Sequence, residues 1–351
     1  MTGTRTWGSL SGSDTLRHVR SLDVWRGVDS GKSSLFAAAR RPIFHWAVSA
    51  HTYNTTTSSG ISRGIPASDL VVSLGAFCAQ GLDCSGTTAE QAGTFMHELG
   101  HNLGLRHGGG DDVNRKPNYL SVMNYAFQLA GLVRDGQSGV FDYSLFPGGL
   151  QTLPDVNEAS LSEKTGFSGA GSLLTRYTTT WHCPSAWTTG AVSGGLDLDC
   201  DGTSGETVSL DLNSDGSTTT LSPWNDWDHI VFDGGQVGDT AGVSLPDTMW
   251  PKEPSAKVLR ATQKVLLGDT KPPRVKVRVR AKGRVVVIAR DAKALDRMVI
   301  RVDKKTRQYT VKGAKVKLVR FQVKRGTHRV RAGALDRAGN SSRLVRRTVR
   351  R

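Results

Sequence analysis

Long apolar segments are missing from this sequence of 351 residues. No run of apolar side chains approaches the roughly 20 residues that a helix needs to cross a bilayer, which excludes a membrane-spanning helix. The first ten residues are polar and rich in glycine and threonine, so no secretory signal is recognisable there. The length still leaves room for a sizeable core and for more than one domain.

Acidic residues are scarce in the last part of the chain. The whole sequence has 46 Lys+Arg and 31 Asp+Glu, but residues 270–351 contain 28 of the basic residues and only four of the acidic ones. The residues before them are mildly acidic, with 18 basic and 27 acidic side chains. Such a break in composition predicts a domain boundary.

Cysteine is also sparse, with four residues in two local pairs. Cys78 and Cys84 are six residues apart and Cys183 and Cys200 are seventeen apart, and neither spacing is that of a zinc ribbon. We expect the sequential disulfides, because they close the shortest loops, with free buried thiols as the alternative. Disulfides indicate an oxidising, extracellular setting, although a secretory signal is missing.

One dense motif contrasts with these absences, His-Glu-Leu-Gly-His-Asn-Leu-Gly-Leu-Arg-His at residues 97–107. His97 and His101 are four residues apart, so on a helix both rings project from one face. A glycine after the second histidine would end that helix and let His107 return to the same metal. Three imidazoles are a complete ligand set for a catalytic zinc, and Glu98 lies where a general base is needed.

Local signals predict the elements around this motif. Thr87 and Glu90 have the spacing of a capping box, which marks the start of a helix. Residues 43–50 and 69–74 have the pattern of buried strands, and residues 14–42 that of a broken helix. Apolar side chains recur along the motif helix at steps of three and four and predict a buried stripe of Ala92, Phe95, Met96, Leu99 and Leu103.

Downstream of the motif, residues 121–125 read Ser-Val-Met-Asn-Tyr. The long histidine motif followed by Ser-x-Met-x-Tyr resembles the metzincin clan of zinc endopeptidases, in particular bacterial secreted members of reprolysin, matrixin or pappalysin type. The resemblance covers roughly residues 40–235. It implies that Met123 forms a tight turn beneath the metal and that Tyr125 assists the transition state.

The same resemblance bears on the start of the chain. In such enzymes a strand–helix–strand unit precedes the strand that residues 44–46 resemble, and we expect this chain to begin after that unit. A misplaced start codon or a truncated gene would explain both the missing unit and the missing secretory signal. The resemblance therefore implies an incomplete sheet beneath the metal site.

Two loops, at residues 197–202 and 211–216, are rich in aspartate and glycine. Each has oxygen-bearing side chains at positions 1, 3 and 5 followed by glycine, which is the first half of a calcium loop. The candidate calcium ligands are Asp197, Asp199, Asp201, Asp211, Asn213 and Asp215. Neither loop has the final glutamate, so Glu206, Asp226 or Asp228 would have to contribute. Turns stabilised by Asp and Asn without metal are the alternative.

Prolines between residues 247 and 273 predict a linker. After it, apolar and basic residues alternate in runs at 274–280, 284–289, 298–302, 316–323, 328–334 and 344–349. Short strands of this period predict a small antiparallel β-sandwich. Residues 334–340 resemble the closing hairpin of bacterial immunoglobulin-like modules.

The basic residues occupy the outward positions of these strands. They either provide solubility and protect the sheet edges, or attach the protein to an anionic surface such as a cell-wall polymer or an acidic substrate. Nucleic acid is disfavoured, because Tyr309 and Phe321 are the only aromatic residues there that could stack on bases.

The sequence as a whole predicts an α+β protein. We expect a metzincin-like zinc protease domain at residues 1–246 with a calcium-binding insertion at 181–233, a linker at 247–273 and a basic immunoglobulin-like sandwich at 274–351. The expected function is zinc-dependent hydrolysis of proteins or peptides, by a protein that is secreted or at the cell surface. The alternative is a truncated, catalytically impaired scaffold that binds a cell surface or cell wall through its basic domain.

Overall fold

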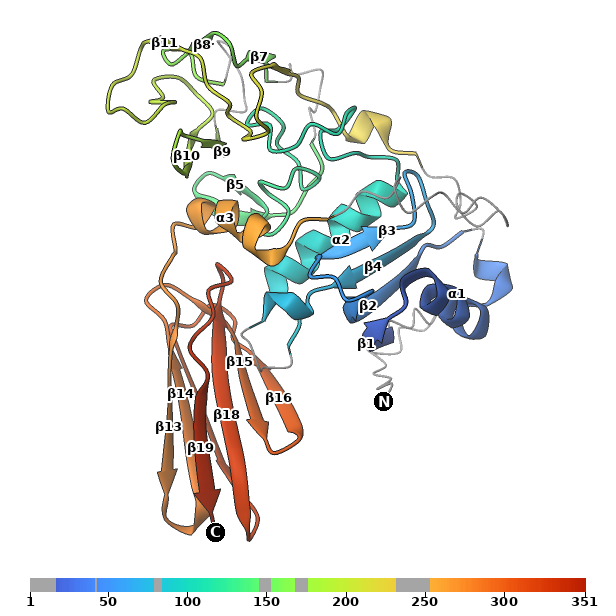
Figure 1. Cartoon of the computed structure of the whole chain (residues 1–351), viewed down its shortest axis with the longest axis vertical. Coiled ribbons are helices and arrows are strands. Elements are labelled where there is room, and N and C mark those ends of the chain that lie inside the picture. Colours follow the sequence, from blue (N-terminus) through green and yellow to red (C-terminus); the bar gives the residue numbers. More distant parts are fainter. Residues whose placement is uncertain (1–16, 42, 79–83, 145–152, 168–175, 232–252) are drawn as a thin grey trace.

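The computed structural model describes residues 17–41, 43–78, 84–144, 153–167, 176–231 and 253–351. It is a mixed α+β structure with many short strands and three α-helices (Figure 1). The helices are α1 (Val24–Leu35), α2 (Thr88–Asn102) and α3 (Ala256–Leu266). Within the described residues, none of them is both long and apolar enough to cross a membrane. The predicted α+β class is confirmed.

A four-stranded sheet supports α2. Its order is β1-β2-β4-β3, with the first three strands parallel and β3 antiparallel at one edge. The bounds are β1 (Arg17–Leu22), β2 (Trp46–Tyr53), β3 (Gly60–Ser62) and β4 (Asp69–Ser73). α1 packs against β2 through a buried apolar cluster that includes Val28, Trp46 and Val48. α2 packs against β3 and β4, so the sheet fixes the helix that carries the histidine motif.

Two expectations about the start of the chain are corrected here. Residues 17–35, expected as part of a broken helix, form the strand β1 and the helix α1, and β1 pairs in parallel with β2. The apolar residues at 35–39, within the stretch expected as a broken helix, lie where α1 ends. Phe36 is its C-cap, and its ring packs against Trp46. The predicted strand at 69–74 is β4, whereas the strand predicted at 43–50 begins later, at Trp46.

The middle of the chain is rich in loops and is held by small sheets, β10-β9-β5-β6, β11-β8 and β12-β7. Their strands are β5 (Leu132–Arg134), β6 (Gln137–Val140), β7 (Val156–Asn157), β8 (Leu161–Ser162), β9 (Tyr177–His182), β10 (Trp187–Ala191), β11 (Thr207–Val208) and β12 (Thr220–Leu221). Cys78 pairs with Cys84 and Cys183 with Cys200, which confirms the sequential disulfides.

The stretch expected as a linker contains a packed helix. α3 buries Leu259 against a cluster that includes Leu74, Phe77 and Tyr125. Arg260 on the same helix forms an ion pair with Glu90 of α2, with Nε 2.7 Å from Oε1. The segment that joins the two parts of the protein is thus fixed to the region around α2.

The basic C-terminal part consists of two antiparallel sheets, β13-β14-β17 and β16-β15-β18-β19 (Figure 1). The strands are β13 (Arg274–Arg280), β14 (Arg284–Arg290), β15 (Leu295–Val302), β16 (Lys305–Thr310), β17 (Val316–Gln322), β18 (Thr327–Asp336) and β19 (Val345–Arg350). All six predicted strands are present. β16 was missed because its sequence, Lys-Thr-Arg-Gln-Tyr-Thr, lacks an apolar alternation. The inward side chains of both sheets, such as Val287 and Met298, form one buried core.

This C-terminal part contacts the beginning of α2. Both carboxylate oxygens of Asp296 lie 3.2 Å from the backbone nitrogen of Thr88, in the first turn of that helix. A carboxylate at a helix N-terminus accepts from unpaired N–H groups and complements the helix dipole. The two parts of the chain are therefore joined at the helix on which the candidate site is built.

Candidate functional site

Helix α2 begins and ends as its sequence predicts. The Thr87 hydroxyl accepts from the Glu90 backbone nitrogen at 3.1 Å, and the Glu90 carboxylate accepts from the Thr87 nitrogen at 2.7 Å. The helix ends at Asn102, and Gly104 follows with φ of +93°, a conformation that side chains other than glycine rarely adopt. The chain can then turn back and bring His107 to the two histidines of the helix.

The predicted apolar stripe of α2 is confirmed only in part. Met96 and Leu103 pack, partly buried, against a core cluster, but the fully buried face of the helix is the polar and glycine-rich one. Phe95 of the stripe is 41% exposed, whereas His97 and His101 are fully buried. Glycines allow this close packing: a Cβ at Gly93 would lie 1.8 Å from the carbonyl oxygen of Gln128, and one at Gly100 would lie 2.2 Å from Sδ of Met123. A large side chain at either position would push the helix away from the turn below it.

The three predicted histidines meet at one point. Nε2 of His101 lies 3.2 Å from Nε2 of His97 and 3.1 Å from Nε2 of His107. His97 Nδ1 is 2.9 Å from the Val122 carbonyl and His101 Nδ1 is 2.8 Å from the Leu105 carbonyl. A carbonyl only accepts, so both Nδ1 atoms carry a proton, and in the neutral form of each ring the lone pair is then on Nε2. Lone pairs that face one another are stabilised by a cation between them.

A fourth group at this point, Glu253, was not anticipated from the sequence. Its Oε1 lies 3.2 Å from Nε2 of His97, 3.5 Å from that of His101 and 3.0 Å from that of His107. Ligands at 2.0–2.1 Å from a tetrahedral zinc are about 3.3–3.4 Å from one another, so these four atoms are spaced like the corners of such a site. The buried group His97, His101, His107 and Glu253 could therefore hold a metal ion.

Burial sets the protonation of this group. It lowers the pKa of His101 to about 4, which leaves a neutral imidazole able to bind a metal. Burial alone would raise the pKa of Glu253, but the neighbouring His97 and His107 lower it well below its usual range, so this group is a carboxylate. His101 thus offers a neutral nitrogen and Glu253 an anionic oxygen as donors.

Glu98 lies fully buried beside the histidines. Burial, and then the charge of Glu253, raises the pKa of Glu98 well above its usual range. Among the described residues, neither of its carboxylate oxygens has a hydrogen-bond partner. The Glu98 carboxyl fits there because residue 60 of the edge strand β3 is glycine: a Cβ at Gly60 would lie 2.3 Å from Oε1 of Glu98. A buried carboxyl without partners is costly and indicates a catalytic or ligand-binding role.

Met123 and Tyr125 also lie at the site. Met123 is fully buried against Gly100 of α2, and its backbone nitrogen donates to the Ser121 hydroxyl at 3.1 Å. The hydroxyl of Tyr125 is 2.9 Å from Nε2 of His107. Burial raises the pKa of Tyr125 well above its usual range, so the phenol keeps its proton and can donate a hydrogen bond.

Asp226, considered above as a calcium ligand, supports this turn instead. It accepts from the hydroxyl groups of Tyr119 at 2.7 Å and Ser121 at 2.5 Å, and from the Ser144 backbone nitrogen at 3.0 Å. These bonds connect the Met123 turn to the segment at residues 224–229. Asp226 therefore fixes the floor of the histidine site.

The six other candidate calcium ligands lie in two loops with the same internal bonding. The carboxylate of Asp197 accepts from the backbone nitrogens of Asp201 at 3.0 Å and Gly202 at 2.9 Å. Asp211 accepts in the same way from Asp215 at 3.1 Å and Gly216 at 2.8 Å. Asp199 and Asn213 occupy the third position of their loops. Calcium binding by these loops stays a prediction.

Two buried glutamates complete these loops, and the sequence reasoning missed both. Glu163 accepts from the backbone nitrogen of Leu198 at 2.7 Å and lies with Asp197 and Asp199. Glu158 accepts in the equivalent way from Leu212 at 2.7 Å. Glu163 directly follows strand β8 and Glu158 directly follows strand β7. The two glutamates end the similar sequences Leu-Ser-Glu and Val-Asn-Glu, and this similarity is the feature of the sequence that could have identified them.

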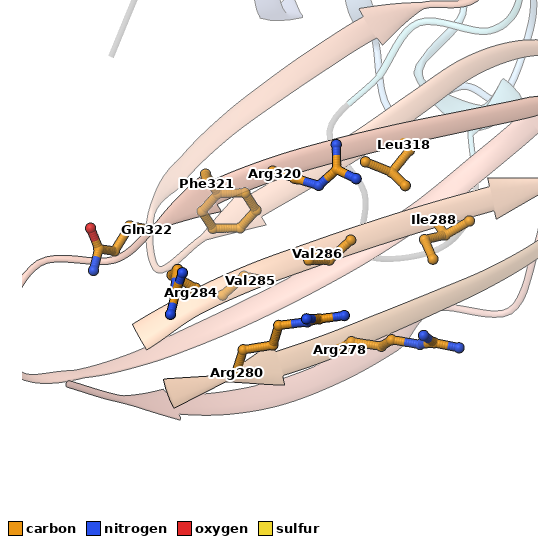
Figure 2. Close-up of a pocket in the computed structure, with 10 residues that line it drawn as sticks. All are labelled: Arg278, Arg280, Arg284, Val285, Val286, Ile288, Leu318, Arg320, Phe321 and Gln322. Carbon is orange, nitrogen blue, oxygen red and sulfur yellow. The ribbon is translucent and has the colours of Figure 1, made fainter. Parts of the chain in front are cut away.

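A second surface of note lies on the outer face of the sheet β13-β14-β17. The outward positions of these strands, set by the strand register, contain Arg274, Lys276, Arg278, Arg280, Arg284, Arg290 and Arg320 and no acidic residue. This face has a hollow of about 470 Å³. Figure 2 shows the side chains that line it, among them arginines on either side of the apolar Val286, Ile288 and Leu318.

The sequence matches none of the protein-family models and none of the curated proteins with which it was compared. The metzincin resemblance therefore depends on the residues of the motif and of the Met123 turn alone.

Proposed function

We propose that this protein is a zinc-dependent endopeptidase. The observation that carries the proposal is the convergence of three histidine Nε2 atoms beside the buried, unpartnered carboxyl of Glu98. Three histidines are a donor set for a catalytic zinc, and a carboxyl next to it is a general base for hydrolysis. The fully buried Met123 beneath the histidines and the phenol of Tyr125 beside them also favour the metzincin assignment.

The roles of the residues follow from their positions. When bound by His97, His101 and His107, zinc supplies an activated water and polarises the scissile carbonyl. Glu98 accepts a proton from the attacking water on its carboxylate and then delivers that proton to the leaving nitrogen. Tyr125, held protonated by burial, donates a hydrogen bond to the oxyanion that develops on the carbonyl oxygen.

Metal removal tests this function. We expect the purified protein to contain about one zinc per chain, as a single three-histidine site requires. Casein cleavage should stop when 1,10-phenanthroline removes the metal and should return when zinc is added back. Zinc content by mass spectrometry and cleavage by gel are the two measurements. Cleavage that persists in the metal-free protein would exclude the proposal.

The outer face of β13-β14-β17 favours a second function, attachment to an anionic polymer. Basic side chains alone would serve solubility, but here they surround an apolar hollow that includes Val286, Ile288 and Leu318 (Figure 2). Charged groups over an apolar floor fit a polymer that presents anionic groups along an uncharged backbone, such as an anionic cell-wall polymer. The endopeptidase would then act close to that polymer.

A pair of charge reversals tests this attachment. Each basic residue near an anionic surface contributes about 1 kcal/mol, so Arg278→Glu with Arg320→Glu should weaken binding to purified cell wall by at least roughly tenfold. Sedimentation with cell wall at rising salt measures it, and the wild-type binding should fall as salt screens the charges. Lys304→Glu with Lys305→Glu changes the charge equally on the other sheet and should have a much smaller effect. Equal losses for both pairs would show that only net charge matters.

A further inference from the structure

We infer that Glu253 is an internal ligand that occupies the place required by the attacking water, so that the chain as folded here is a latent form of the enzyme. The inference rests on the proposed function and concerns the regulation of the same site. A catalytic zinc site keeps one position open for water, whereas a closed set of four protein ligands leaves none. In this structure the fourth corner is taken by Oε1 of Glu253, within 3.5 Å of all three Nε2 atoms.

The chain just after Glu253 contacts the edge of the sheet. Two residues later, Ser255 forms an antiparallel bridge with Ser58, which precedes the edge strand β3. An extended peptide that adds to an exposed sheet edge pairs through its main chain in this manner. Helix α3 then holds the segment in place through buried Leu259. Glu253 is thus presented to the histidines by a segment that lies as a bound peptide would lie.

The residue that decides between a latent enzyme and a purely structural metal site is Glu98. A structural site needs four ligands and no general base. Here a fifth group, Glu98, is fully buried beside the site and has no hydrogen-bond partner among the residues that the structure describes. Leaving a carboxyl in that state is costly unless another state of the site uses it. Water in the place of Glu253 would supply the missing partner.

Glu253 is also less firmly oriented than the two histidines of α2. Backbone carbonyls fix the rings of His97 and His101 through their Nδ1 atoms. The second oxygen of Glu253, Oε2, is buried and has no hydrogen-bond partner among the described residues. Ligands whose second donor atom is hydrogen-bonded are held more firmly than ligands without such support. The carboxylate of Glu253 can therefore leave more easily than His97 or His101.

A small ligand that competes for the fourth position measures this directly. The apparent dissociation constant of such a ligand rises in inverse proportion to the fraction of molecules in which the position is open. We would replace zinc by cobalt, whose visible spectrum reports its ligands, and titrate the full chain with acetohydroxamate. The comparison is between wild type, Glu253→Ala and Glu253→Gln, with Asp155→Ala as control, because Asp155 is an exposed carboxylate.

We expect Glu253→Ala and Glu253→Gln to keep the cobalt and to bind acetohydroxamate at least roughly tenfold more tightly than the wild type, which corresponds to an open fraction of a tenth or less. Casein cleavage by their zinc forms should increase by a similar factor. Asp155→Ala should match the wild type in both measurements. If Glu253→Ala fails to fold, which its thermal unfolding would show, Glu253→Gln carries the test because it keeps the size of the side chain.

Two results would overturn the inference. Equal acetohydroxamate affinities in the wild type and both variants would show that Glu253 does not occupy the position. Loss of cobalt from both variants would show that it is an integral structural ligand. The proposed function fails separately: tighter acetohydroxamate binding without casein cleavage by any zinc form would keep Glu253 as the internal ligand and exclude the peptidase. Rapid cleavage by the wild type, unchanged in the variants, would keep the peptidase and exclude latency.

Discussion

Replacing Glu98 by glutamine should abolish peptide hydrolysis while the metal stays bound. The amide has nearly the shape of the carboxyl, so it fits the space that Gly60 leaves, but it cannot accept the proton of the attacking water. Loss of a general base typically lowers the rate by roughly 10²–10⁴-fold, and we expect a loss within that range. The rate of casein cleavage and the zinc content measure the two effects.

The Glu253→Ala background makes this test sharper, because its fourth position is open in our proposal. Glu98→Gln combined with Glu253→Ala should be as inactive as Glu98→Gln alone. A suitable control is Gln91→Glu, which introduces a carboxyl on the same helix at a partly buried position away from the histidines. Turnover that survives Glu98→Gln would show that Glu98 is not the base, even if zinc proves essential.

The sequence predicted which histidines meet at the site better than it predicted what surrounds them. The motif predicted that His97, His101 and His107 lie together beside Glu98. A helix of 3.6 residues per turn with a glycine at its end restricts the relative positions of these side chains. The capping box at Thr87 was equally well defined, since both of its bonds are local. Features of the site that depend on contacts between residues close in the sequence could therefore be predicted.

Long-range contacts could not be predicted in this way. Glu253 lies 146 residues after His107 and precedes a proline in a stretch whose composition is that of a linker, so no periodic pattern marks it as a candidate ligand. Phe95 was assigned to the core because it is apolar. The close approach of the Met123 turn instead favoured the glycine face of α2, and nothing in the sequence of the helix announces that partner.

The prediction of a broken helix at the start of the chain was wrong for a related reason. β1 and α1 are weakly patterned, and α1 has glycine and serine where stronger helix formers would be expected. Tertiary contacts outweigh this weak propensity, since Val28 is fully buried and Phe36 packs on Trp46. The support for α2 is therefore more complete than the sequence indicated. The C-terminal part adds to it, because Asp296 lies at the first turn of that helix.

His101→Ala should remove the metal and with it the stabilisation that the metal provides. His101 is the central ligand, with its Nε2 close to Nε2 of both His97 and His107. Losing even a partner that only orients a ligand weakens metal binding by about 10–100-fold, so losing the ligand itself should weaken it by more than roughly 100-fold. Competition with a zinc chelator of known affinity measures the change.

Thermal unfolding provides a second measurement of the loss of metal binding in His101→Ala. An ion that binds only the folded chain stabilises it by about 4 kcal/mol when its concentration is 1,000 times the dissociation constant. Added zinc should thus raise the unfolding temperature of the metal-free wild type and leave that of His101→Ala nearly unchanged. His229→Ala, in the short turn Trp227–His229 and exposed, should keep both the zinc and the shift. If His101→Ala retained wild-type zinc affinity, the three histidines would not be the metal site and the mechanism built on them would fall.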